Sequence, residues 1–140
     1  MKMFPSNLLF KKYHKANKNF LQLNDQKSFF PLFCEFALQT EEAGKLTYKQ
    51  IESCRRTIRR GLGKKGVFKI RLFTSVPVSS KPISSRMGSG KGGISHWIAP
   101  IKKGQVIFEI NCFSKEQAFF ILTKASSKLP IKTKIVNLKY

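Results

Sequence analysis

The stretch TYKQIESCRRTIRRGLG, residues 47–63, decides the fold class, because it is a complete helix signature set among strand patterns. Thr47 and Gln50 form a capping box, in which the hydroxyl accepts a hydrogen bond from a free backbone N–H and the amide reaches back to the cap. Gly61 and Gly63 are expected to end the helix. Four apolar residues at helical spacing predict one buried stripe: Ile51, Cys54, Ile58 and Leu62.

Strand patterns lie on both sides of this helix. We expect a strand over residues 28–39, a turn at 41–44 and a half-buried strand over 67–73. In the second strand Lys69 and Arg71 alternate with apolar residues and give a basic outer face. The segment that starts at Val76 is expected to be an edge, because the proline that follows cannot donate to a ladder.

The last third of the chain continues the alternation. Strands over 94–101 and 105–112 are expected to form a hairpin around residues 102–104. Ser114 and Gln117 form a second capping box, and Pro130 stops the helix that follows. A final strand covers 131–138. The apolar face of this helix comprises Ala118, Ile121, Leu122, Ala125 and Leu129.

The order β-α-β-(loop)-β-β-α-β predicts an α+β fold with two helices and a mostly antiparallel sheet. We expect a single domain over residues 28–140, preceded by a basic extended arm over 1–27. A glycine-rich loop over 79–93 is long for a connection in a compact domain, and such loops are usually functional or disordered.

The charge points to a polyanionic partner. The chain has 27 Lys and Arg against 7 Asp and Glu, a formal net charge of +20, and no acid between Glu52 and Glu109. A solvated basic surface usually comes with a near balance of acids, which is missing here. No apolar run reaches the roughly 18–20 residues that span a bilayer. The first 24 residues are basic and acid-free, as in a transit peptide, but they lack arginine, so an arm that contacts a phosphate backbone is preferred.

Nucleotide chemistry is excluded for the loop RMGSGKGG, residues 86–93. A phosphate-binding loop needs glycine where Ser85 stands and a hydroxyl where Gly92 stands, and a helix must follow it. Here a strand pattern follows. The G-x-G-x-x-G spacing is present, but no βαβ unit surrounds it. Glycines still allow backbone N–H groups to approach phosphates closely, so the loop fits a polyanion.

Catalytic and metal-binding patterns are also missing from the sequence. His14 and His96 are isolated, the acids are scattered, and no cysteine pair has metal-ligand spacing. We expect neither enzymatic activity nor a cofactor, and we expect the cysteines to be small buried apolar residues: Cys34, Cys54 and Cys112. Trp97 is expected in the core, although an indole can also stack on a base. The richness in Phe, Lys, Ile and Ser matches AT-rich coding and hints at an organelle-encoded gene.

Several segments, in order and over roughly residues 8–136, resemble the L-sixteen family of large-subunit ribosomal proteins of the bacterial and organellar type. The matching segments are Phe10–Lys15, Lys45–Arg56, Lys69–Phe73, Lys81-Pro82, Arg86–Gly88, Gly90–Gly92, Trp97 and Lys128–Thr133. The resemblance implies a hammerhead-like α+β fold and a structural constituent of the large ribosomal subunit. It implies partners in large-subunit rRNA near the peptidyl transferase centre, in A-site tRNA and in neighbouring ribosomal proteins, and no free homo-oligomer.

The resemblance also implies roles for particular residues. In such a protein the loop tip faces tRNA, through Arg86, Met87, Gly88, Gly90, Lys91 and Gly92. The arm threads into rRNA, through Lys11, Lys12, His14 and Lys15. The basic helix and strand faces are further candidates for rRNA binding, through Arg55, Arg56, Arg59, Arg60, Lys69 and Arg71.

Departures from the family pattern bear on the source of the chain. The family loop reads R-M-G-K-G-K-G, and Ser89 replaces its middle lysine; the preceding P-D-K-P is replaced by residues 74–77, which carry no charge. This drift favours a mitochondrial ribosome, with a bacterial cytoplasm or a plastid as the alternative. An RNA- or DNA-binding module outside the ribosome is the alternative function.

Overall fold

The computed structural model describes residues 4–9, 11–14, 28–64, 66–88, 90–112 and 114–138. Its elements follow one another along the chain as two strands, a helix, four strands, a second helix and a last strand. They are β1 Phe36–Thr40, β2 Gly44–Thr47, α1 Tyr48–Leu62, β3 Val67–Ile70, β4 Val76–Ser80, β5 Gly93–Ile101, β6 Val106–Asn111, α2 Lys115–Ser126 and β7 Thr133–Asn137.

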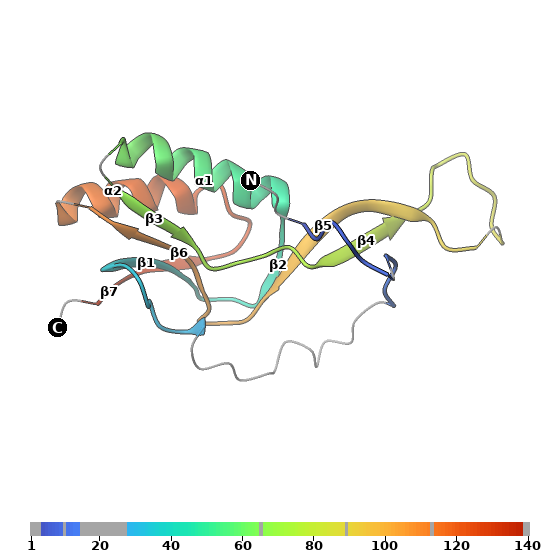
Figure 1. Ribbon diagram of the computed structural model, residues 1–140, viewed down its shortest axis with the longest axis horizontal. Coiled ribbons are helices and arrows are strands. Elements are labelled where there is room, and N and C mark those ends of the chain that lie inside the picture. The colour runs from blue at the N-terminus through green and yellow to red at the C-terminus, as the bar shows by residue number, and fades with distance from the viewer. Residues whose placement is uncertain are drawn as a thin grey trace.

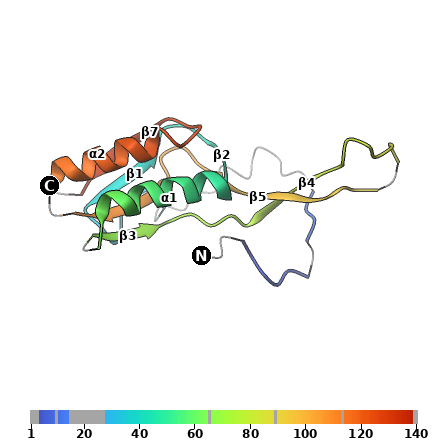
Figure 2. The ribbon, with the colours of Figure 1, turned by 90° about the horizontal axis from the view of Figure 1, so that it is seen from above.

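The strands form two antiparallel sheets. Four strands pair in the order β3-β6-β1-β7, and three pair in the order β2-β5-β4. Helices α1 and α2 lie side by side on one face of the four-stranded sheet (Figures 1 and 2). The three-stranded sheet leads away from this body, and β4 and β5 carry the loop 81–92 to the far end of the molecule (Figure 1). The prediction of an α+β fold with two helices and mostly antiparallel strands is confirmed.

Helix α1 forms as its sequence predicts. Thr47 is its N-cap, with the Gln50 N–H donating to the Thr47 hydroxyl at 3.4 Å and the Thr47 N–H donating to the Gln50 side chain at 2.9 Å. The predicted apolar stripe is buried along its whole length. One hydrophobic core joins both helices and both sheets, because Leu46 of β2 and Ile101 of β5 belong to the same cluster as Phe108 of β6.

The predicted hairpin of residues 94–112 is wrong. A turn does form at 102–105, with Gly104 at φ 82°, but β5 belongs to the small sheet and β6 to the large one. Thr40, fully buried at the end of β1, accounts for the separation. Its N–H donates to the Gln105 carbonyl at 3.0 Å, its carbonyl accepts from the Gly104 N–H at 2.8 Å, and its hydroxyl donates to the Lys102 carbonyl at 2.7 Å. The turn is therefore hydrogen-bonded to the end of β1, and β5 and β6 do not pair with each other as a hairpin.

Other boundaries differ from the prediction for local reasons. The strand expected over 28–39 begins only at Phe36, and β2 was not predicted. Gly61 lies inside α1, where a Cβ would be 2.6 Å from Ile121 Cγ1, so its missing side chain permits the close approach of α2. Gly63, at φ 63°, is the C-cap. Ser114 precedes α2 but makes no side-chain capping bond, so the second capping box is wrong while its helix is correct.

The cysteines are free thiols packed in the fold. Cys34 and Cys54 are buried, as expected, and Cys112 is half-buried. Cys54 donates to the Ala125 carbonyl at 3.4 Å and so ties α1 to α2, and burial raises its pKa to about 11. Among the described residues no helix is long and apolar enough to cross a bilayer, and no three potential ligands gather as a metal site would require.

Candidate nucleic-acid interface

Every described residue of the loop from 81 to 91 is exposed. Arg86 and Lys91 are exposed, and Met87 is 94% exposed. Gly88 and Gly90 have φ values of 95° and 74°, which side chains rarely adopt, and the Gly90 N–H donates to the Gly88 carbonyl at 2.9 Å. The glycines thus make a tight bend whose backbone a ligand can approach closely, because no side chain covers it at Gly88 or Gly90.

The base of the loop is closely packed. At Gly92 an added Cβ would overlap the carbonyl oxygen of Ser80, whereas at Gly93 it would meet nothing within 4 Å. The two sides of the loop therefore touch at Gly92, and the bend begins beyond this point. Glycine is required at Gly92 for close approach and at Gly88 and Gly90 for backbone conformation.

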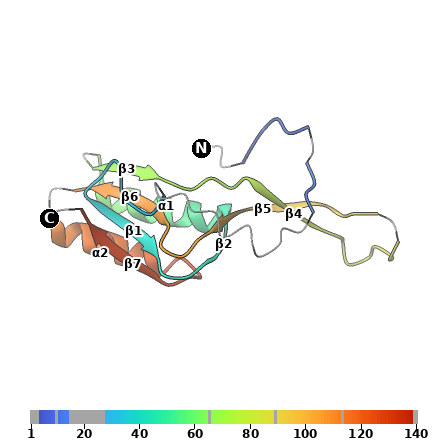
Figure 3. The ribbon, with the colours of Figure 1, turned by 90° about the horizontal axis from the view of Figure 1, so that it is seen from below.

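The N-terminal arm returns to the molecule beside β4 and β5 (Figure 3), and there it contacts the base of the loop. The Lys12 ammonium donates to the Lys91 carbonyl at 3.0 Å, and the Lys91 ammonium donates to the Tyr13 carbonyl. We call this pair of contacts the clasp. Farther along the arm, Phe4 stacks on Trp97 with ring centroids 6.1 Å apart. Trp97 is half-buried beneath this ring, which differs from the full burial expected of a core residue.

The clasp separates Lys91 from the other residues predicted at the tip of the loop. Arg86, Met87, Gly88 and Gly90 belong to the distal bend, but Lys91 lies directly before the packed base. Its ammonium reaches back to the arm. Of the predicted arm residues, Lys11, Lys12 and His14 are exposed, and Lys15 lies outside the described residues.

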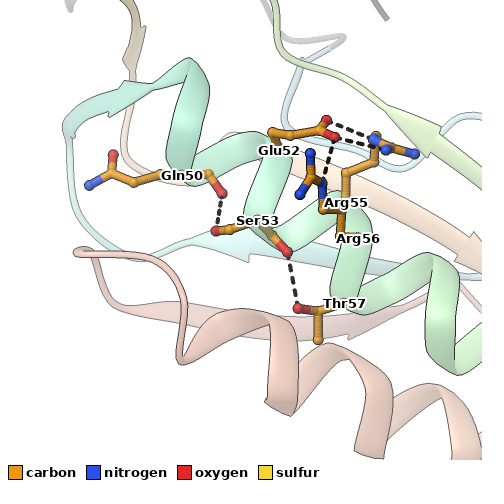
Figure 4. A network of polar contacts seen from close by, with 6 residues as sticks. All are labelled: Gln50, Glu52, Ser53, Arg55, Arg56 and Thr57. Carbon is orange, nitrogen blue, oxygen red and sulfur yellow. Dashed lines mark hydrogen bonds and ion pairs between the residues drawn. The ribbon is translucent and has the colours of Figure 1, made fainter.

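The basic face of α1 is built around one acid (Figure 4). Glu52 accepts from Arg55 at 2.7 and 2.8 Å and from Arg56 at 3.1 Å. Hydrogen bonds from Arg55, and then from Arg56, lower the pKa of Glu52 to about 2. Arg59 donates to the Gly66 carbonyl at 3.2 Å, which leaves its charge unneutralised. The four predicted arginines lie together around a shallow hollow of about 230 Å³: Arg55, Arg56, Arg59 and Arg60.

A second hollow, of about 500 Å³, separates the outer sides of α1 and α2. Arg60 lines it from α1, and Lys124 lines it from α2 with its ammonium 4.0 Å from the centroid of the Phe120 ring. No acid lines this hollow. Arg60 therefore borders both hollows and connects them into one basic surface.

The two cations predicted on the outer face of β3, Lys69 and Arg71, lie in different surroundings. Lys69 is exposed on β3. Arg71 follows the end of β3, and its guanidinium binds the carboxylate of Glu109, which is fully buried in β6. Only 15% of the Arg71 side chain is exposed. Arg71 is thus engaged within the protein, which favours a structural role over the predicted contact with RNA.

The alternation pattern missed what Glu109 does. Along β6, Glu109 faces the outer side of the sheet, opposite to that of Phe108 and Ile110, and every residue from Val106 to Ile110 is buried. The outer side is covered by residues 28–35, which we call the strap (Figure 3). The Glu109 carboxylate accepts from the Leu32 N–H at 3.1 Å and from the Phe33 N–H at 2.8 Å, and these bonds hold the strap on the sheet. The one available signal was the apolar run around Pro31.

Comparisons with known proteins agree on one family. The family model described as Ribosomal protein L16p/L10e matches residues 9–136. The chain is 38% identical over 133 residues to the large ribosomal subunit protein uL16 of Buchnera aphidicola subsp. Cinara cedri, covering 95% of each chain. It is 40% identical over 135 residues to uL16 of Chlamydia pneumoniae, covering 96% of each. It is 43% identical over 126 residues to uL16c of Gracilaria tenuistipitata, covering 90% of this chain and 93% of the relative.

Proposed function

Since the chain belongs to the ribosomal protein L16p/L10e family and is a structural, non-enzymatic constituent of the large ribosomal subunit, we propose that it binds large-subunit rRNA near the peptidyl transferase centre and helps to position A-site tRNA. The observation that carries the proposal is the placement of charge. Glu52 of α1 and Glu109 of β6 are paired with arginines of the same chain, whereas Arg59 and Arg60 of α1 and the cations of the loop are exposed and have no acidic partner among the described residues.

The rRNA interface is assigned to the basic faces of the body. Arg59 and Arg60 on α1 and Lys69 on β3 are exposed, and no acid among the described residues pairs with them. The guanidinium group can fork onto a phosphate, and each phosphate neutralised releases counterions. We assign Arg55 and Arg56 a weaker share, because both already bind Glu52.

The tRNA-facing role is assigned to the distal bend of the loop. It lies at the end of the molecule opposite the helices (Figure 1). The side chains of Arg86 and Met87 are exposed to solvent, and the glycines leave the backbone accessible. A long reach with little side-chain bulk suits contact with a substrate held at a distance from the rRNA-bound body.

The ribosome that contains the chain is proposed to be mitochondrial. The Phe, Lys, Ile and Ser bias of the composition and the loss of loop cations support this assignment. A bacterial cytoplasm or a plastid is the alternative, and the similar proteins from bacteria and from Gracilaria tenuistipitata are compatible with it.

Sedimentation tests the assignment to a ribosome. Lysate from purified mitochondria is resolved on a sucrose gradient, and we expect the chain in the large-subunit peak at low and moderate salt. Its absence from that peak, with a pool at the top of the gradient, would instead support a nucleic-acid-binding module outside the ribosome. Its absence from mitochondria, together with a large-subunit peak in another fraction, would overturn only the location.

Two variants separate the rRNA and tRNA contacts. Arg59→Gln with Arg60→Gln should make the salt dependence of rRNA binding shallower. The plot of log association constant against log salt concentration has a negative slope, and its magnitude should fall by about 2, since each phosphate contact contributes nearly one unit. Arg86→Ala should leave assembly intact and slow peptide elongation. Lys103→Ala, which removes an exposed cation from the turn at the end of β5, is the matched control. Elongation at the wild-type rate in the Arg86 variant would refute the role of the loop.

A further inference from the structure

The strap exposes an aromatic ring on the face of the large sheet opposite the helices. Phe33 is 64% exposed, although a phenylalanine ring normally gains stability from burial. Two cations lie close to it, with Lys69 Nζ 5.8 Å and Arg71 Cζ 5.5 Å from the ring centroid. The strand that carries Lys69, β3, belongs to the large sheet and lies apart from the loop 81–92 (Figure 3).

The ring is held in place by buried groups. The Phe33 N–H donates to Glu109 Oε2, and the N–H of the preceding residue donates to Glu109 Oε1, which also binds Arg71. A fully buried carboxylate with three donors fixes both the strap and the guanidinium beside the ring. The backbone that carries Phe33 is thereby held in place, so a ligand need not order the strap on binding.

Lys69 remains available to a ligand. The strand register places Lys69 opposite Glu109, but that carboxylate is occupied by Arg71 and two backbone N–H groups. No ion pair of Lys69 occurs among the described residues. An exposed flat apolar surface thus adjoins an exposed, unneutralised cation.

We propose that Phe33 and Lys69 form a binding site for one unpaired rRNA nucleotide, whose base stacks on the Phe33 ring and whose phosphate meets the Lys69 ammonium. Stacking on aromatic rings and contact of phosphate with lysine are the two interactions by which proteins hold splayed RNA bases. Arg71 and Glu109 act as positioning residues. This inference rests on the proposed function, since it names a further contact of the same subunit.

RNA fits this site better than a neighbouring protein does. An apolar protein surface on Phe33 would bury the Lys69 ammonium without supplying an anion, and burying an unpaired charge is costly. A nucleotide supplies the flat ring and the anion together. It also leaves the Arg71 and Glu109 pair undisturbed.

The test uses intact large subunits that contain Phe33→Leu, which keeps an apolar side chain and removes the aromatic face. Unpaired rRNA bases are probed with dimethyl sulfate at adenine and cytosine and with a water-soluble carbodiimide at uracil and guanine. We expect one unpaired nucleotide to gain reactivity by about fivefold or more, because stacking on one aromatic side chain contributes roughly 1–3 kcal/mol per base. Phe33→Trp should keep that base protected, and Lys69→Gln should expose the same base. Phe30→Leu, which alters another exposed ring of the strap, should change nothing there.

A photoreactive benzoylphenylalanine at position 33 identifies the occupant independently. A crosslink to rRNA at the base exposed in Phe33→Leu supports the proposal. A crosslink to a ribosomal protein, or wild-type reactivity throughout the rRNA of Phe33→Leu subunits that contain the chain, would overturn it. Loss of the wild-type chain from the large subunit would overturn the proposed function as well, and the gradient distinguishes the two failures.

Discussion

Replacing Glu109 with glutamine removes one negative charge from the interior and leaves the shape almost unchanged. The carboxylate is fully buried and serves Arg71 and the N–H groups of Leu32 and Phe33. Glutamine keeps one acceptor oxygen and adds an NH₂ group that cannot accept. At least one buried N–H then loses its acceptor, and Arg71, only 15% exposed, loses its counter-ion. Removing one member of a buried pair typically costs about 3–5 kcal/mol, a figure that already contains the lost hydrogen bond.

Urea unfolding of the purified chain at pH 7, followed by far-ultraviolet circular dichroism, measures this cost. With an m-value of about 1.5 kcal/mol/M, the midpoint of Glu109→Gln should fall by about 2–3 M. Glu52→Gln is the matched control, since it breaks pairs with two arginines at the surface and should cost no more than about 1 kcal/mol.

A double variant separates the contribution of the buried charge pair from that of the hydrogen bonds to the strap. Arg71→Met with Glu109→Leu removes both charges and should recover the part of the loss that comes from the unpaired guanidinium, because a buried ion pair is often replaceable by apolar residues. The part that comes from the Leu32 and Phe33 N–H groups should remain, since leucine supplies no acceptor for them. If Glu109→Gln unfolds within about 1 kcal/mol of the wild type, the strap is not held by this carboxylate. In that case other contacts hold the backbone that carries Phe33.

Three further changes test the packing and the charges elsewhere. Gly61→Val places a Cβ 2.6 Å from Ile121 Cγ1 and should cost about 1–3 kcal/mol by overpacking, measured by the same urea titration. Gly92→Ala should lower hydrogen-exchange protection of β4 and β5 near the loop, whereas Gly93→Ala, with open space around it, should not. The pKa of Glu52 is lowered to about 2, so the stabilisation that its carboxylate gives is present above pH 4–5 and is lost as the pH falls toward 2. Glu52→Gln should therefore flatten the dependence of the free energy of unfolding on pH between about pH 5 and about pH 2, and it should leave that dependence unchanged above about pH 5.

The helices were predictable because their signals are local. The capping box, the apolar stripe and the terminal glycine of α1 lie within residues 47–63, and each specifies the same element. The partition of the strands into two sheets was not predictable, since it depends on Thr40 binding a turn more than 60 residues away. A lysine-lysine-glycine turn between two apolar runs indicates a hairpin, and only the distant competitor reveals that the runs separate.

The same distinction applies to the candidate site. Exposed cations on α1 and in the loop follow from local periodicity and glycine content, so their exposure was predictable, while their contacts with RNA stay a prediction. Arg71 and Lys69 look alike in the alternation of residues 67–73, yet one binds Glu109 and the other faces solvent. Alternation reports which side of a strand a residue faces, but it does not report whether a separate segment, here the strap, covers that side.

The position of the acids explains why the arm is fastened to the loop as it is. Residues 53–108 contain no Asp or Glu, and this run includes β3, β4, β5 and the whole loop. No carboxylate of its own can neutralise the extension, so the clasp uses backbone carbonyls in place of carboxylates: Lys12 donates to Lys91 and Lys91 donates to Tyr13. These contacts are exposed and join like charges, so they contribute little stability and gain nothing from charge neutralisation. A phosphate is a stronger acceptor for either ammonium than a carbonyl is. We therefore expect RNA to take over the clasp lysines at small cost, so that the arm separates from the loop on assembly while the packed base at Gly92 keeps its place.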